Sequence, residues 1–246
     1  MPRFDKNEDL QKHNLGHFGF SAVRVEDLGA TEYTIVTIVA DRSGSTDGFT
    51  QDMEASLKEV IKSCQHSPRA DNLLIRLVTF EDEHQEVHGF KLLEHCNLDD
   101  YSGVLSPGGC TALYDATLDS VEATQNYAKQ LTDQDFGVNA ILFVLTDGLD
   151  NRSKFAGTHV GQALKKAVTS EAMESLVSVL IAVNTQDAQA SAYLSDFHSQ
   201  AGFTQFVELK DASKSTLARL ANFVSKSISS QSQSLGRGGT SPSITF

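Results

Sequence analysis

The residues best suited to chemistry in this chain are five oxygen-bearing side chains in three short segments, DRSGST, PGGCTALYDA and LTDGLDN. They are Asp41, Ser43, Ser45, Thr111 and Asp147. Carboxylate and hydroxyl oxygens are the ligands that hard cations such as Mg²⁺ prefer in proteins. The set contains no evident pair of nucleophile and general base. It therefore indicates a site that binds a cation rather than one that catalyses a reaction.

Buried strands and the turns that follow them would position these residues. YTIVTIVA (33–40) and VNAILFVL (138–145) are nearly continuous apolar runs, typical of parallel strands covered on both faces. Asp41 follows the first run and Asp147 lies just beyond the second. Ligands of a doubly wound sheet lie beyond the carboxyl ends of its strands. We therefore expect these strands to be neighbours, the three segments to meet at one crevice, and an extended turn over 41–45 to point its side chains the same way.

The remaining apolar patterns alternate between strand and helix periods. They predict strands over 73–80, 86–93, 175–184 and 204–209, and helices from Thr46 or Asp47 as cap to Cys64 and over 113–131, 158–173, 188–200 and 211–229. This alternation predicts an α/β fold with a doubly wound, mostly parallel central sheet flanked by helices. The short 86–93 strand is expected at an edge and antiparallel.

The two ends differ in composition from the middle. We expect a polar N-terminal extension over 1–30, with an additional strand in GFSAVRV (19–25), and a single domain over 31–229. The Ser/Gly-rich segment 230–246 cannot bury a core, so we expect a flexible tail.

Charge and cysteine content narrow the functional classes. The formal net charge of −12 argues against binding to nucleic acid or to an anionic membrane surface. The polar start lacks the apolar segment of a signal peptide. The three cysteines form no C-x-x-C pair, so neither a disulfide framework nor a thiolate zinc site is indicated. A cytoplasmic protein is the simplest interpretation.

Together, the three segments resemble the von Willebrand factor A (vWA) domain family. DRSGS is similar to the family's Asp-x-Ser-x-Ser motif, Thr111 to its isolated threonine, and Asp147 to its distal aspartate. The resemblance covers roughly residues 31–229, and GG-x-TALYDA with LTDG-x-DN looks most like bacterial cytosolic members.

The resemblance implies a metal-ion-dependent adhesion site. Ser43, Ser45 and Thr111 would contact Mg²⁺ directly, with Mn²⁺ or Ca²⁺ as alternatives, and Asp41 and Asp147 would act mainly through water. A Glu or Asp of a protein partner would complete the coordination. Bacterial relatives often work with AAA-type ATPases, so such an ATPase is one candidate partner. A second metal site of the integrin type is not implied, because Asp47 does not match its position.

Several other residues allow two interpretations each. Asp115 could support the metal site or favour the start of a helix, whereas Asp150 and Asn151 would shape a rim or cap. The H-x-E-x-H pattern of His84, Glu86 and His88 could bind a transition metal, but a solvated edge strand is favoured. The run EDE (81–83) is expected to be a solvated turn, and Cys110 a small buried residue.

Two further functional classes remain open. The polar N-terminal extension and the Ser/Gly-rich tail could act as arms of a self-assembling structural subunit. A metal with water-linked carboxylates could also hydrolyse phosphoesters. The sequence has no G-x-S-x-G elbow and no phosphate loop, so a metal-dependent phosphohydrolase is the weaker interpretation and we expect no enzyme.

Overall fold

A computed structural model describes residues 10–235 and 245–246 of the chain. Its strands are β1 (Gln11–Asn14), β2 (Gly19–Ala22), β3 (Glu32–Asp41), β4 (Leu73–Phe80), β5 (His84–Leu92), β6 (Gly137–Thr146), β7 (Leu176–Ala182) and β8 (Gln205–Glu208). Its α-helices are α1 (Thr50–Gln65), α2 (Leu113–Thr132), α3 (Gly157–Thr169), α4 (Ala188–Ala201) and α5 (Lys214–Leu235). Within residues 10–235, no helix is long and apolar enough to cross a membrane.

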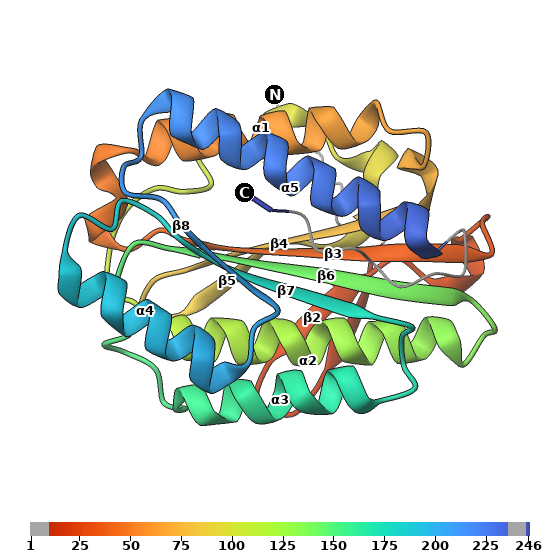
Figure 1. The fold of residues 1–246 in the computed structure, drawn as a ribbon. Helices are drawn as coiled ribbons and strands as arrows, with labels where there is room; N and C mark the ends of the chain where they lie inside the picture. The colour runs from red at the N-terminus through yellow and green to blue at the C-terminus, as the bar shows by residue number, and fades with distance from the viewer. Residues whose placement is uncertain (1–9, 236–244) are drawn as a thin grey trace.

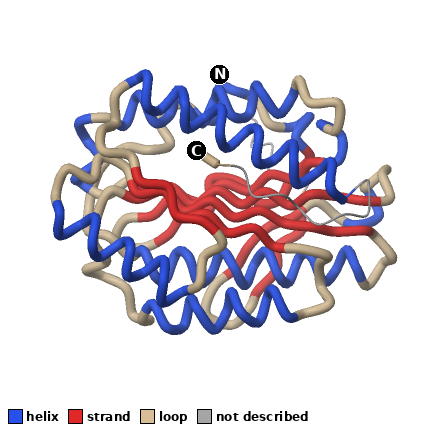
Figure 2. Tube along the Cα trace, in the orientation of Figure 1, coloured by secondary structure: helices blue, strands red, loops and turns tan. Residues whose placement is uncertain are grey.

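The strands form one eight-stranded sheet in the order β1-β2-β5-β4-β3-β6-β7-β8. The pairs from β4 through β3, β6 and β7 to β8 are all parallel. Helices α1 and α5 cover one face, and α2, α3 and α4 cover the other (Figure 1, Figure 2). The predicted fold class is confirmed, as is the expectation that the two longest apolar runs form neighbouring strands, β3 and β6.

At its N-terminal side the sheet gains β2, which confirms the additional strand expected within 19–25, and β1, which the sequence did not predict. Strand β5 is antiparallel to β4, as expected, but it is not an edge strand, because β2 pairs with its other side and β1 with β2. Phe18, Phe20 and Ala22 of this hairpin are buried in a core shared with α2. The hairpin joins the sheet because apolar residues alternate at positions 18, 20 and 22, so that they all point into this core.

Helix α5 also continues beyond its predicted end at 229. Gln231 is buried, and its Nε2 donates hydrogen bonds to the Ala140 carbonyl oxygen (3.1 Å) and to Ser175 Oγ (2.9 Å). Leu235 is buried as well. These tertiary contacts offset the modest helix propensity of the Ser/Gln run. The segment 236–244, part of the expected flexible tail, lies outside the described residues, while Phe246 packs against Phe223 with ring centroids 5.7 Å apart.

Candidate metal centre

Asp41 forms the floor of the candidate site. It is the last residue of β3 and is fully buried. Its Oδ1 accepts a hydrogen bond from the Ser43 amide (2.8 Å), and its Oδ2 accepts one from Thr146 Oγ1 (2.6 Å). Burial raises the pKa of Asp41 to about 6, although both hydrogen bonds oppose this shift. The floor is thus a buried carboxylate fixed from two sides.

Above this floor, the hydroxyl oxygens of two serines and a carboxylate oxygen of a second aspartate lie within hydrogen-bond distance of one another in a chain. Ser43 Oγ lies 3.1 Å from Ser45 Oγ, and Ser45 Oγ donates a hydrogen bond to Asp147 Oδ1 at 2.7 Å. Ser43 is buried and Ser45 is exposed. Burial raises the pKa of Asp147 as well. The oxygens of the site therefore extend from the buried interior, at Asp41 and Ser43, to the solvent-exposed surface, at Ser45.

The backbone between these residues differs from the predicted extended turn. Ser43 is extended, but a 3-10 helix follows over Gly44–Gly48, and α1 begins only at Thr50. Thr46 therefore does not cap α1; its Oγ1 donates to the Ser43 carbonyl oxygen at 2.8 Å. The tight turn, rather than strand-like alternation, brings the two serine hydroxyls together.

Thr111 is held between the loops that carry Asp41 and Asp147. Its amide donates to Asn151 Oδ1 (2.9 Å), and the Asn151 amide donates to its carbonyl oxygen (3.0 Å). On the other side, the Gly44 amide donates to the Gly109 carbonyl oxygen (3.4 Å). Thr111 is itself buried. The three segments that the sequence singled out are therefore joined by backbone hydrogen bonds at one edge of the sheet.

Gly109 allows this close approach. Its φ of +62° is a conformation that favours glycine, and a Cβ there would lie 2.8 Å from Glu81 Oε2. Glu81 is half-buried and pairs with Arg42, with 2.7 Å between Nη2 and Oε1. The expectation that the EDE run is a purely solvated turn is thus wrong at its first residue, because the run packs against the loop of Thr111.

Residues around the site have structural roles that the sequence left open. Asp115 accepts the amides of Lys154 and Phe155, so it anchors the loop after β6. Asp150 accepts the Tyr114 amide (3.0 Å) at the start of α2. Thr146, which sequence reasoning missed, supports the floor; its position next to Asp147 in the TDG turn was the only signal. Cys110 is exposed, contrary to expectation, since its loop turns outward.

The H-x-E-x-H pattern does not form one face. Between Glu86 and His88, β5 contains one more residue than the paired part of β4, and this bulge interrupts the alternation. His88 is buried and contacts Tyr101 in the core beside α1, with Nε2 and the hydroxyl 2.9 Å apart. Glu86 instead accepts hydrogen bonds from Arg76 and Ser21. The favoured solvated edge and the three-residue metal site are therefore both wrong for this pattern.

The chemistry of the donor set at the sheet edge fits a hard divalent cation. Hydroxyls and carboxylates supply only oxygen ligands, as Mg²⁺ requires. Among residues 10–235, no Lys, Arg or His side chain forms an ion pair with Asp41 or Asp147. The raised pKa values of both carboxyls reflect this uncompensated burial, which a bound cation would offset.

Comparison with known proteins reveals likeness in structure only. No family model and no curated protein sequence matches the chain. A mutant of the PilB minor pilin from Streptococcus sanguinis has a TM-score of 0.60 at 14% identity, over 89% of this chain and 66% of the pilin. The pilus adhesin SpaC from Lactobacillus rhamnosus GG has a TM-score of 0.58 at 12% identity, over 81% and 30%.

A third similar structure is proximal thread matrix protein 1 from the mussel byssus, with zinc in its metal-ion-dependent adhesion site (MIDAS) motif. Its TM-score is 0.52 at 21% identity, over 81% of this chain and 46% of that protein. The chain thus spans between 30% and 66% of the lengths of these proteins. At such identities the likeness concerns the fold, and the chain has a vWA-like fold.

Proposed function

We propose that this chain is a metal-dependent protein-binding module. Mg²⁺ would be held by Asp41, Ser43, Ser45, Thr111 and Asp147, and a Glu or Asp of a partner protein would complete its coordination. The observation that carries this proposal is the contact of Ser45 with Asp147 at 2.7 Å and with Ser43 at 3.1 Å. The contact between Ser45 and Asp147 joins potential ligand oxygens from two loops, at residues 102 positions apart in the sequence.

The hydrogen bonds already present support a division of roles among these residues. Both oxygens of Asp41 are engaged by Ser43 and Thr146, so this carboxylate supports the cation through charge and bound water. The hydroxyls of Ser43, Ser45 and Thr111 can turn their lone pairs to a cation, and we assign direct contact to them. When bound, the cation supplies the positive charge that attracts a carboxylate to a chain whose net charge is −12.

Binding rather than catalysis is part of the same proposal. A general base must be free to accept a proton from a reacting group. The Asp41 carboxylate instead accepts two hydrogen bonds from within the fold, and Asp147 accepts one from Ser45. Among the similar structures, the mussel protein is described with a metal in its MIDAS motif and SpaC as an adhesin. These descriptions support a binding function for the shared fold.

Manganese titration followed by electron paramagnetic resonance tests the metal site on the purified chain. Thr111→Ala and Ser43→Ala each remove a hydroxyl ligand, and we expect Mn²⁺ affinity to fall at least about tenfold. Ser106→Ala is the matched control, since this exposed serine lies on the neighbouring loop and its hydroxyl contacts the Gly103 carbonyl oxygen. Equal Mn²⁺ affinity in all four proteins would refute the site.

Partner capture tests the second half of the proposal. The chain is immobilised in Mg²⁺, and retained proteins are compared after adding EDTA and with the Thr111→Ala variant. We expect a specific partner to be lost in both cases and to be retained by Ser106→Ala. A partner that binds equally in EDTA would show that recognition does not pass through the metal.

A further inference from the structure

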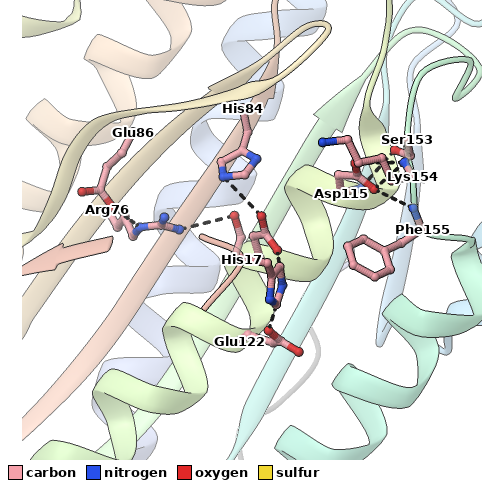
Figure 3. A network of polar contacts seen from close by, with 11 residues as sticks. His17, Arg76, His84, Glu86, Asp115, Glu122, Ser153, Lys154 and Phe155 are labelled. Carbon is pink, nitrogen blue, oxygen red and sulfur yellow. Dashed lines mark hydrogen bonds and ion pairs between the residues drawn. The ribbon is translucent and has the colours of Figure 1, made fainter. Parts of the chain in front are cut away.

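A second cluster of side chains that could ligate a metal lies beside α2 and shares no residue with the adhesion site (Figure 3). His17 comes from the turn between β1 and β2, and Asp119 and Glu122 lie three positions apart on α2, so they share one helix face. One ligand atom from each lies within 4.8 Å of the other two. His17 Nε2 is 3.1 Å from Asp119 Oδ1 and 3.6 Å from Glu122 Oε2.

Asp119 is the unusual member of this cluster. Its side chain is only 6% exposed, and the one ion pair of its buried Oδ1 among the described residues is with His17 Nε2, 3.1 Å away. A carboxylate buried to this degree is costly unless a cation compensates its charge. The neighbouring Arg76 forms no ion pair with Asp119. Its Nε donates to Glu86 Oε2 at 2.7 Å and its Nη1 donates to Ser120 Oγ at 3.3 Å.

We propose that His17, Asp119 and Glu122 bind a divalent transition ion of the zinc class. One imidazole nitrogen with two carboxylate oxygens is a donor set that Zn²⁺ accepts and that differs from the all-oxygen set of the adhesion site. Tetrahedral ligands about 2.0–2.2 Å from zinc lie roughly 3.3–3.6 Å from one another. The two contacts of His17, at 3.1 and 3.6 Å, span this separation.

The surroundings provide both access and support for such an ion. The side chains of His17 and Glu122 are 43% and 34% exposed, so an ion can enter from solvent while Asp119 holds it from within. His84 Nε2 lies 3.3 Å from Oδ2 of Asp119, the oxygen that does not face His17. We assign His84 as a positioning residue that orients the Asp119 carboxylate.

The bound ion would connect the N-terminal hairpin to α2. Apart from the His17 contacts, a polar contact between the hairpin and this helix joins His13 Nδ1 to Gln130 Nε2, 3.4 Å apart. Since the ion binds the folded arrangement and not separated ligands, it stabilises the folded state by an amount that increases with the logarithm of the free zinc concentration above the dissociation constant. Zinc should therefore raise the unfolding temperature of the chain.

Calorimetric titration of the purified full chain with ZnCl₂ tests this site. His17→Ala and Glu122→Gln change partly exposed ligands, and we expect each to weaken this zinc site at least about tenfold. His95→Ala is the matched control, because His95 also lies beside a carboxylate, 3.8 Å from Glu94, but is 64% exposed and outside the cluster. Thr111→Ala separates any zinc bound at the adhesion site from zinc bound here.

A spectroscopic readout locates the ion independently of affinity. Zinc should shift the side-chain ¹⁵N resonance of Nε2 in His17 and leave that of His95 unchanged. His84→Ala should weaken zinc binding and His84→Gln, which keeps an N–H donor, should restore it. Unchanged zinc affinity and stoichiometry in His17→Ala and Glu122→Gln would overturn the proposal, as would a wild-type chain whose only zinc is lost in Thr111→Ala.

Discussion

Thr146 donates a hydrogen bond to Asp41 across the neighbouring strands β6 and β3, with 2.6 Å between Oγ1 and Oδ2. Both residues are fully buried, so no solvent replaces this contact. The last residues of two central strands thus fix the carboxylate beneath the candidate metal site. This relationship makes the site depend on a residue that is not one of its five proposed ligands.

Thr146→Val tests that dependence. Valine has nearly the same shape but no hydroxyl, so Asp41 Oδ2 is left without its donor. We expect a loss of about 1–3 kcal/mol in the free energy of unfolding and a decrease of roughly 10- to 100-fold in Mn²⁺ affinity. Urea denaturation and paramagnetic resonance measure the two effects. Thr146→Ser keeps the hydroxyl and should retain Mn²⁺ affinity; a similar loss in both variants would contradict the role of the hydrogen bond.

Gly109→Ala tests the packing of the Thr111 loop. The added Cβ would meet Glu81 Oε2 at 2.8 Å, and the φ of +62° disfavours any side chain. We expect a cost of about 1–3 kcal/mol in unfolding free energy, measured by urea denaturation. Gly29→Ala is the control, since no atom lies within 4 Å of a Cβ there and its φ is not in the left-handed region. Equal stability of the two variants would argue against a strained loop.

His88 predicts a pH dependence of stability. Burial, with the Lys91 charge second, lowers the pKa of His88 to about 3 from its ordinary value of 6.5. Between these values the unfolded chain binds a proton that the folded chain does not. Stability should therefore decrease as the pH falls from about 6.5 toward 3, by up to about 1.4 kcal/mol per pH unit from this residue.

The contribution of His88 is isolated by comparing variants. Unfolding free energies of the wild type, His88→Gln and His95→Gln are measured by urea denaturation at several pH values between 4.5 and 7. His88→Gln should flatten the acid-side slope, and His95→Gln, which changes a mostly exposed histidine, should keep it. Parallel slopes in all three proteins would show that His88 is not held neutral.

Gln231→Ala tests the extension of α5 beyond residue 229. The change removes the donors to the Ala140 carbonyl oxygen and to Ser175 Oγ within a buried region. We expect a loss of about 1–3 kcal/mol in unfolding free energy. Gln233→Ala, an exposed position two residues along the same helix, should change stability by less than about 0.5 kcal/mol. A similar loss at both positions would indicate a general effect on helix propensity.

The sequence predicted most of the fold because its central strands are unambiguous. Continuous apolar runs identify β3 and β6, and alternation with amphipathic helices leaves a doubly wound sheet as the natural arrangement. It also predicted the segments that carry the candidate site, since Asp41 directly follows the first run and Asp147 lies two positions after the end of the second. Local pattern and chain order were sufficient for these features.

Features that depend on long-range contact were not predictable in the same way. The bulge that turns His88 away from Glu86 arises from the pairing of β5 with β4, which no local pattern records. The end of α5 depends on contacts of Gln231 with residues about 90 positions earlier, including Ala140. Likewise, His17 meets Asp119 because the hairpin of β1 and β2 closes over α2, a contact between residues about 100 positions apart.

The most direct test of the proposed function is the position of a bound metal in crystals of the full chain grown with Mn²⁺. Anomalous scattering should place one manganese ion about 2.1–2.3 Å from the hydroxyl oxygens of Ser43, Ser45 and Thr111, with Asp41 and Asp147 nearby. Manganese found only elsewhere, with Ser45 Oγ still hydrogen-bonded to Asp147 at saturating Mn²⁺, would contradict the adhesion-site account.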